Sequence, residues 1–275
     1  MFKNKWLKFL YLLPLFACIG FSIGVSAEQL VVVGEAYRLD DGKPVYREYH
    51  YYSEDRLNHQ VVYYALDNDP GAGKRLELMA EKTLNYRYGL ASPEFTQRNY
   101  IYPEVIEVEW QGQALSISYQ QGDKGATKAQ EQPLKTPLVI DAGFDHFIRQ
   151  QWQPLVAGET LDFYYAAPTR QSLLALQVQK KSCGPDQVDR ACFEINSSNW
   201  LVRLVLQPIE ISYDLENKKL RRFSGLANML DRDGGSLKVD IRYCYLSEPT
   251  TSEACNAEAL KHAANQLASR VNKTD

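Results

Sequence analysis

The residues best suited to chemistry gather in one stretch, VIDAGFDHFIRQQW, at 139–152. It contains Asp141, Asp145 and His146, and a carboxylate that orients a histidine can make the imidazole a general base. Adjacent residues on a helix point about 100° apart, so Asp145 is badly placed to orient its own neighbour. A hydrolase that uses His146 with a nearby carboxylate is therefore the alternative hypothesis.

The same stretch has the pattern of a short amphipathic helix at about 145–153. Asp145 is the expected N-cap, and Pro154 is expected to end the helix. The apolar residues fall on one face at helical spacing: Phe144, Phe147, Ile148 and Trp152. We expect Phe144, Ile148 and Trp152 to point inward together, and His146 not to pair with Asp145.

No motif in the chain predicts a metal site or a cofactor. DNDPGAG (67–73) and DRDGG (231–235) resemble the start of a calcium loop but lack an acid at its twelfth position, so both are interpreted as turns. The histidines lack the tight spacing of a zinc hydrolase. GFSIG (20–24) matches a nucleophile-elbow pattern, but it lies within a leader-like segment.

Residues 1–27 have the pattern of a secretory signal peptide. Three lysines precede an apolar run, and Val25-Ser26-Ala27 forms a small-residue cleavage site after Ala27. A lipoprotein anchored at Cys18 is the minority interpretation. Loss of the three lysines leaves 28 basic against 34 acidic residues, a net charge of −6. That balance argues against nucleic acid as a partner and against electrostatic capture by a membrane.

Four cysteines remain after the leader, and an even count in an exported chain favours disulfides. Of the three possible connectivities, the local pairs Cys183–Cys192 and Cys244–Cys255 are preferred because each closes a short loop rich in turn residues. The expected compartment is the periplasm.

The rest of the chain predicts a mainly β, antiparallel fold. Tyr- and Val-rich segments alternate with short polar turns, without helices between them. We expect a β region at 28–120, a polar connection at 121–137, and a second β region at 138–275 that ends in a helix at about 252–271. Residues 198–206 suit either a strand or a helix.

A strongly curved sheet, or half-barrel, around the short helix would leave a concave apolar surface suited to an apolar ligand. The residues expected to line it are Phe144, Phe147, Trp152, Phe163 and Tyr165. The leading hypothesis is a non-catalytic periplasmic protein that binds an apolar ligand or assists envelope assembly. A protein-interaction module with an exposed sheet edge is a further alternative.

Residues 138–246 resemble exported proteobacterial β proteins of unassigned function. The resemblance is carried by a Tyr-Asp pair before a polar turn, a basic strand, and then a Gly and an Asn. Here these are Tyr213, Asp214, Gly225 and Asn228. Some such proteins look like the half-barrel of periplasmic lipoprotein carriers, so the resemblance implies that fold and compartment and supplies no catalytic residues.

Overall fold

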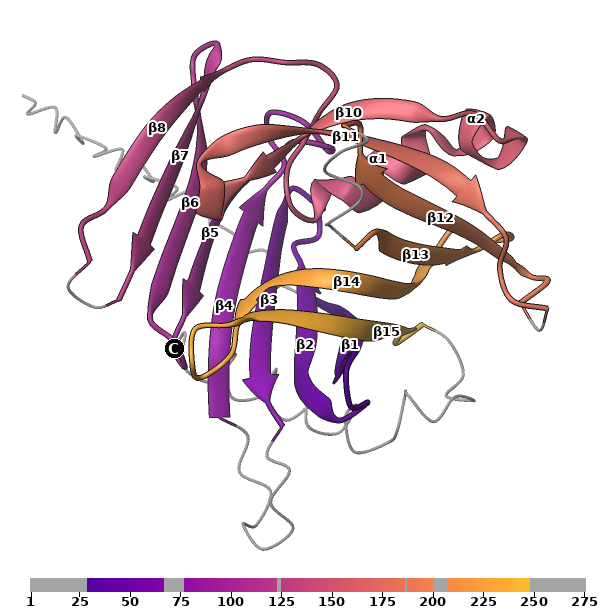
Figure 1. Cartoon of the computed structure of the whole chain (residues 1–275), viewed down its shortest axis with the longest axis horizontal. Helices are drawn as coiled ribbons and strands as arrows, with labels where there is room; N and C mark the ends of the chain where they lie inside the picture. Colours follow the sequence, from indigo (N-terminus) through magenta and orange to yellow (C-terminus); the bar gives the residue numbers. More distant parts are fainter. Residues whose placement is uncertain (1–28, 67–76, 123–124, 186, 200–206, 248–275) are drawn as a thin grey trace, which may run out of the picture.

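The structure is a computed structural model that describes residues 29–66, 77–122, 125–185, 187–199 and 207–247. Within these residues the chain forms fifteen strands of a single sheet, two short α-helices and one 3-10 turn. The predicted fold class, a mainly β and strongly curved antiparallel sheet with a packed helix, is confirmed (Figure 1). No described helix is long and apolar enough to cross a membrane.

The first eight strands form an antiparallel meander. They are β1 (Gln29–Arg38), β2 (Pro44–Tyr52), β3 (Asn58–Ala65), β4 (Glu77–Asn85), β5 (Glu94–Asn99), β6 (Glu104–Gln111), β7 (Ala114–Gln121) and β8 (Lys128–Pro133). The expected polar connection at 121–137 thus contains a strand of its own.

After β8 the chain crosses to the opposite edge of the sheet. The strands that follow are then added from that edge back towards β1. The elements of this half are β9 (Leu138–Val139), α1 (Gly143–Gln150), α2 (Trp152–Ala157), β10 (Leu161–Ala167), η1 (Pro168–Arg170), β11 (Ser172–Lys181), β12 (Arg190–Ser197), β13 (Ile209–Asp214), β14 (Leu220–Leu230) and β15 (Ser236–Tyr245). β9 pairs in parallel with β10, and the other pairs are antiparallel. β15 pairs with β1, so the first and last described strands meet in the middle of the sheet.

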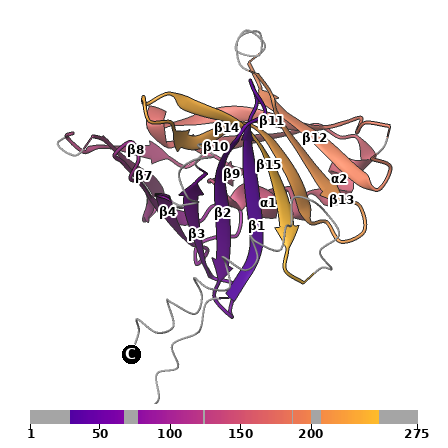
Figure 2. The ribbon, with the colours of Figure 1, turned by 90° about the horizontal axis from the view of Figure 1, so that it is seen from below.

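The sheet bends until its two edges approach each other, and Figure 2 shows β1 and β15 at the bend between its halves. Just after η1, the Gln171 side-chain amide donates to the carbonyl oxygens of Ile117 (3.2 Å) and Lys128 (2.6 Å). The Gln132 side chain donates to the Gln171 carbonyl oxygen at 2.9 Å. These contacts join the edges through side chains, and the ladder of strands itself ends at β8 and β9.

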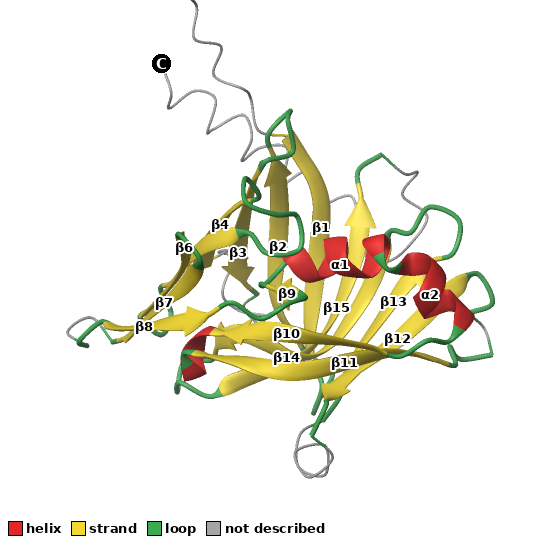
Figure 3. Cartoon of the chain, turned by 90° about the horizontal axis from the view of Figure 1, so that it is seen from above, coloured by secondary structure: helices red, strands yellow, loops and turns green. Residues whose placement is uncertain are grey.

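Helix α1 lies between the two halves of the sheet (Figure 3). Its N-terminus can come so close to the loop that precedes β5 because residue 143 is glycine. A Cβ there would lie 2.2 Å from the Ala91 carbonyl oxygen. The following segment packs against β10–β13 in a second core that includes Phe147, Ile148 and Trp152.

The helix differs from the expected one at both ends. Its N-cap is Ala142, without a side-chain hydrogen bond, and Asp145 lies in the first turn instead of capping it. Asp145 forms an ion pair with Arg149, one turn later, at 2.5 Å. Pro154 does not end the helix either. It lies in the first turn of α2, where its missing N–H costs little, and Gly158 ends that helix with a φ of 98°.

The Tyr- and Val-rich segments expected as strands include β1, β2 and β3, whereas the polar segments that form β5 and β8 were not expected as strands. Several predictions concern residues outside the described ones: the signal peptide at 1–27, the turn at 67–73, the core of the ambiguous segment at 200–206, the helix at 252–271, and Cys255 as the partner of Cys244.

Candidate functional site

A cavity of about 230 Å³ lies between α1 and the inner face of the bent sheet. Its lining comes from both halves of the sheet and from the segment that starts α1. Segments far apart in sequence therefore meet there, which is typical of ligand sites.

One wall of the cavity is aromatic and polar. Side chains of a strand alternate between its faces, so β2 presents every second residue to the cavity: Tyr46, Glu48, His50 and Tyr52. The neighbouring strands add His59, Val61, Tyr63, Lys82 and, beyond β4, Tyr86. From β15 come Ile241, Tyr243 and Tyr245.

The opposite wall is largely apolar. Strands β10 to β14 contribute Phe163, Leu176, Ile195, Ile209, Leu220, Phe223, Leu226 and Met229. A molecule in the cavity would therefore meet hydroxyls, imidazoles and carboxylates on one side and hydrocarbon on the other.

A buried ion pair joins the two halves at this cavity. The Lys82 ammonium lies 2.8 and 2.9 Å from the two carboxylate oxygens of Asp141. The same carboxylate accepts hydrogen bonds from the Asn228 side chain (2.9 Å) and the Ala142 backbone N–H (2.7 Å). Asp141 has a φ of 43°, a left-handed conformation that Asp tolerates better than most residues. These four contacts satisfy a carboxylate that would be costly to bury alone.

A chain of hydrogen bonds runs along the polar wall. Glu48 Oε1 lies 3.0 Å from His50 Nε2, and His50 Nδ1 lies 2.9 Å from His59 Nε2. His59 Nδ1 continues the chain to the Tyr86 hydroxyl at 3.2 Å. Burial, together with the nearby His50 and Lys82, lowers the pKa of His59 well below its usual value. A neutral imidazole can donate through one nitrogen and accept through the other, as such a chain requires.

His146 lies on α1 and lines the cavity without pairing with Asp145, as expected. Its ring packs edge-to-face on Tyr86, with the ring centroids 5.0 Å apart. Burial and the nearby Arg149 guanidinium lower the pKa of His146 to about 4. Burial raises the pKa of the Asp145 carboxyl. Among the described contacts, no hydrogen bond joins His146 to a carboxylate, so this geometry does not favour the hydrolase hypothesis.

The structure separates the five expected ligand-binding residues into two groups. Phe144, Phe163 and Tyr165 line the cavity. Phe147 and Trp152 do not line it and are buried in the second core, to which Phe163 also belongs; there Trp152 packs edge-to-face on Phe193. Ile148 is completely buried, whereas Phe144 is half-buried at the cavity. Whether the three lining residues bind a ligand stays a prediction.

The polar wall was not anticipated as part of a site. Alternation along YREYHYY places the side chains of Tyr46, Glu48, His50 and Tyr52 on one face, and this signal was available in the sequence. Lys82 had no such signal, because its partner Asp141 is 59 residues away.

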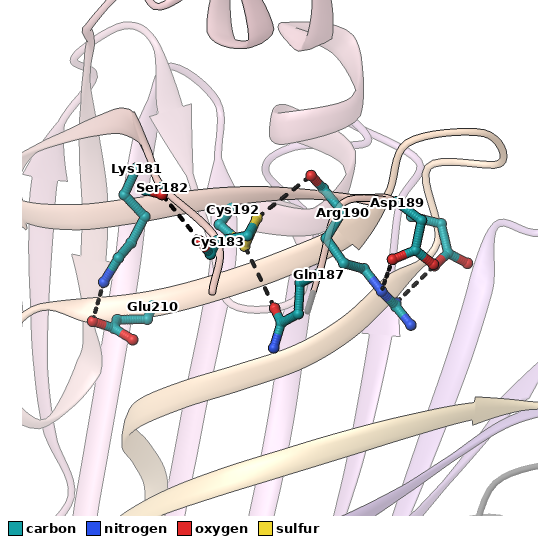
Figure 4. The surroundings of a disulfide bond; sticks show 9 residues. Lys181, Ser182, Cys183, Gln187, Asp189, Arg190, Cys192 and Glu210 are labelled. Atoms are coloured by element: carbon teal, nitrogen blue, oxygen red, sulfur yellow. Dashed lines mark hydrogen bonds and ion pairs between the residues drawn. A yellow bond between two sulfur atoms is a disulfide. The ribbon is translucent and has the colours of Figure 1, made fainter. Parts of the chain in front are cut away.

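The disulfide Cys183–Cys192 is present and joins the end of β11 to β12, with 5.4 Å between the Cα atoms (Figure 4). Nearby, the Lys181 ammonium pairs with the Glu210 carboxylate. Cys244 is buried at the end of β15. Its expected partner Cys255 lies outside the described residues, so that pairing stays a prediction.

The described residues contain no group of three or more His, Cys, Asp or Glu side chains that could hold a metal ion. DRDGG forms a turn, as expected. The Asp231 carboxylate accepts hydrogen bonds from the backbone N–H groups of Asp233 (3.0 Å) and Gly235 (2.7 Å).

Comparison with known proteins supplies no function for the chain. No protein-family model matches the chain, and no curated protein does. Among solved structures, the chain is similar to a β-barrel-like protein of a domain of unknown function, DUF1849, from Brucella abortus. The two share 9% sequence identity over 79% of this chain and 98% of that one, with a TM-score of 0.46. The likeness is to a β-rich, barrel-like protein of unknown function, and it does not support the expected relationship to lipoprotein carriers.

Proposed function

We propose that the protein is a non-catalytic binding protein that holds a small, largely apolar ligand between α1 and the inner face of its sheet. The observation that carries this proposal is the cavity itself, with an apolar wall facing a wall of tyrosines and polar side chains. A filled core would give no such space, because protein interiors are normally close-packed.

The volume of the cavity limits the size of the ligand. A cavity of roughly 150 Å³ can hold benzene, and this one measures about 230 Å³. By proportion the occupant has on the order of ten non-hydrogen atoms. A whole phospholipid is too large to be enclosed there, so the proposal is restricted to small molecules.

We further propose that the protein acts in the periplasm. Two features support this location: the leader-like residues 1–27 and the disulfide Cys183–Cys192, a bond that is rare in reducing compartments. A role in envelope assembly would follow if the ligand is an envelope component.

The test is native mass spectrometry of protein purified without detergent, comparing the wild type with Leu176→Trp. Leu176 lines the apolar wall, so a tryptophan there fills the cavity. Ala175→Trp is the matched control, because Ala175 is exposed on the same strand. We expect a small bound molecule in the wild type and in Ala175→Trp and none in Leu176→Trp.

If all three proteins carry nothing and bind no small apolar probe, the binding proposal is wrong. Capture of an envelope protein by such an empty chain would favour the interaction-module hypothesis instead.

A further inference from the structure

We propose that the cavity selects a ligand whose polar end is a protonated amine rather than a carboxylate or a phosphate. This inference rests on the proposed binding function and names the class of ligand. It comes from the charges of the lining: Glu48, Asp141 and Asp145 are acidic, and Lys82 is the only Lys or Arg among the described lining residues.

Lys82 is already neutralised. Its ammonium contacts both oxygens of Asp141, and it also lies 5.8 Å from the ring centroids of Tyr63 and Phe95. An anionic ligand would have to compete with Asp141 for this cation. Loss of that contact would leave a carboxylate buried without its counter-charge, which is strongly unfavourable.

Glu48 is the lining carboxylate without a Lys or Arg partner among the described contacts. Its side chain is only 5% exposed, and it lies against His50, which is charged only when protonated. Asp145, by contrast, pairs with Arg149, a residue outside the lining. A buried carboxylate of this kind gains most from a cation brought in by a ligand.

The Glu48 side chain fits because the residue opposite it on the neighbouring strand has no side chain. Residue 34, on the neighbouring strand β1, is glycine, and a Cβ there would lie 2.7 Å from the Glu48 Cγ and 2.9 Å from its Oε1. The carboxylate therefore packs against bare backbone on one side and faces the cavity on the other.

Tyrosine rings surround the same region. Six of them lie on the polar wall: Tyr46, Tyr52, Tyr63, Tyr86, Tyr243 and Tyr245. The face of an aromatic ring attracts a cation, and aromatic cages are a recurring means of binding ammonium groups. Burial raises the pKa of these tyrosines. Their hydroxyls therefore stay neutral and do not add further negative charge.

Two of the lining histidines, His59 and His146, do not supply a hidden positive charge at neutral pH. The lowered pKa values of His59 and His146 keep both rings uncharged there. With Lys82 occupied, the polar wall offers an anion no unpaired Lys or Arg within the described lining.

Three probes with the same phenyl body test this inference: 2-phenylethylamine, 2-phenylethanol and 3-phenylpropionate. Each has roughly the size that the cavity volume suggests. We expect titration calorimetry at pH 7.5 to give at least tenfold tighter binding of the amine than of the carboxylate, with the alcohol between them. Glu48→Gln should weaken amine binding at least tenfold and leave alcohol binding within twofold.

Glu109→Gln is the control variant, because Glu109 is an exposed carboxylate of β6 outside the lining. It should leave the affinities for all three probes unchanged. Near-ultraviolet circular dichroism checks that Glu48→Gln keeps its fold. If that variant unfolds, the order of affinities of the three probes for the wild type still decides the inference.

The inference is overturned if the carboxylate binds as tightly as the amine, or if a folded Glu48→Gln variant binds the amine unchanged. In either case binding of the alcohol would still support the apolar cavity. If none of the three probes binds and native mass spectrometry finds no bound molecule, the proposed binding function itself is wrong.

Discussion

At the residue scale, Lys82 and Asp141 form a buried ion pair on the inner side of the molecule. Their side chains are 8% and 6% exposed, and they tie β4 to the segment that begins α1. A buried ion pair adds little net stability compared with an apolar pair. Removal of one partner, however, leaves the other charge unpaired in a poorly hydrated site.

Replacement of Lys82 by Met should therefore destabilise the protein by roughly 3–5 kcal/mol, because Asp141 loses its counter-ion. Urea denaturation gives the free energy of unfolding. Glu77→Gln is the matched control: Glu77 also lies on β4 and pairs with Arg232, but both side chains are exposed, so the cost should stay below about 1 kcal/mol. Restoring charge balance with Lys82→Met/Asp141→Asn should recover part of the loss. Equal effects of Lys82→Met and Glu77→Gln would contradict the assignment.

His146 gives a prediction about pH. Its pKa falls from an unfolded value near 6.5 to about 4, so between those values the unfolded chain binds more protons than the folded one. The contribution of His146 to stability is present above pH 6.5 and is lost as the pH falls towards 4. Wild-type protein should therefore lose more stability between pH 7.5 and pH 5 than His146→Gln does. Urea denaturation at both pH values measures the difference, and identical losses would show that His146 does not titrate in this way.

At the residue scale the sequence was informative where a contact is local. The absence of a pair between His146 and Asp145 followed from helix geometry, and so did the apolar face that holds Ile148. Asp145 was nevertheless misjudged as a cap, because an acid near a helix start can pair with Arg149 one turn later just as well. Contacts such as Asn228 with Asp141, 87 residues apart, leave no local trace in the sequence.

At the scale of elements, the position of α1 depends on close contact with the loop that precedes β5. Gly143 lies against Ala91 and Pro93, and the Ile140 N–H donates to the Ala91 carbonyl oxygen at 3.0 Å. These neighbours are backbone and a proline ring, which cannot move aside as a flexible side chain can.

Gly143→Ala should therefore lower the free energy of unfolding by about 1–3 kcal/mol, the usual cost of overpacking. Gly184→Ala is the matched control, because a Cβ at residue 184 meets nothing within 4 Å. Thermal denaturation of both variants compares them directly. A stability of Gly143→Ala equal to that of Gly184→Ala would mean that α1 can shift without cost.

The strands were predictable to the extent that their composition is typical. The Val- and Tyr-rich segments of β1, β2 and β3 were identified with their turns, because β-branched and aromatic residues favour a pleated surface. β5 (EFTQRN) and β8 (KAQEQP) are polar and were missed. β5 is held by its two neighbours in the sheet, and Gln97 and Asn99 are buried in side-chain hydrogen bonds. That stabilisation is tertiary and is not encoded in local propensity.

At the scale of the whole molecule, the two edges of the sheet are joined mainly through Gln171. Its side chain reaches the backbone of both β7 and β8, and its own carbonyl oxygen accepts from Gln132. This arrangement holds the edge strand β8 against the turn that precedes β11.

Gln171→Ala should loosen β8 without unfolding the rest. Two hydrogen bonds are lost, worth roughly 1 kcal/mol each, so hydrogen exchange of the β8 amides should accelerate about tenfold or more. Exchange in β13 and β14 should not change. Gln179→Ala is the control, since the described contact of its side chain reaches only Glu194 on the adjacent strand. Unaltered exchange in β8 would show that the edges do not depend on Gln171.

The cavity belongs to this scale as well. A curved sheet around a helix could be predicted from strand and turn patterns, but its hollow interior could not. The cavity volume depends on how the lining residues of one half, such as Phe163 and Leu176, are placed relative to those of the other, such as Tyr52 and Tyr86. The chain crosses from β8 to the opposite edge of the sheet, and this crossing brings the two sets of lining residues together. No local residue pattern predicts the crossing.

The pairing of β1 with β15 has a consequence for the order of folding. Val32 pairs with Tyr245, so this side of β1 has its strand partner only when almost the whole described chain is available. The meander β1–β8 can form from local contacts, but joining it to β15 requires a contact between distant residues, which makes folding slow. Until then β1 exposes an open strand edge, and such edges attract other chains. We therefore expect premature termination before β15 to yield a chain that aggregates rather than a stable half-molecule.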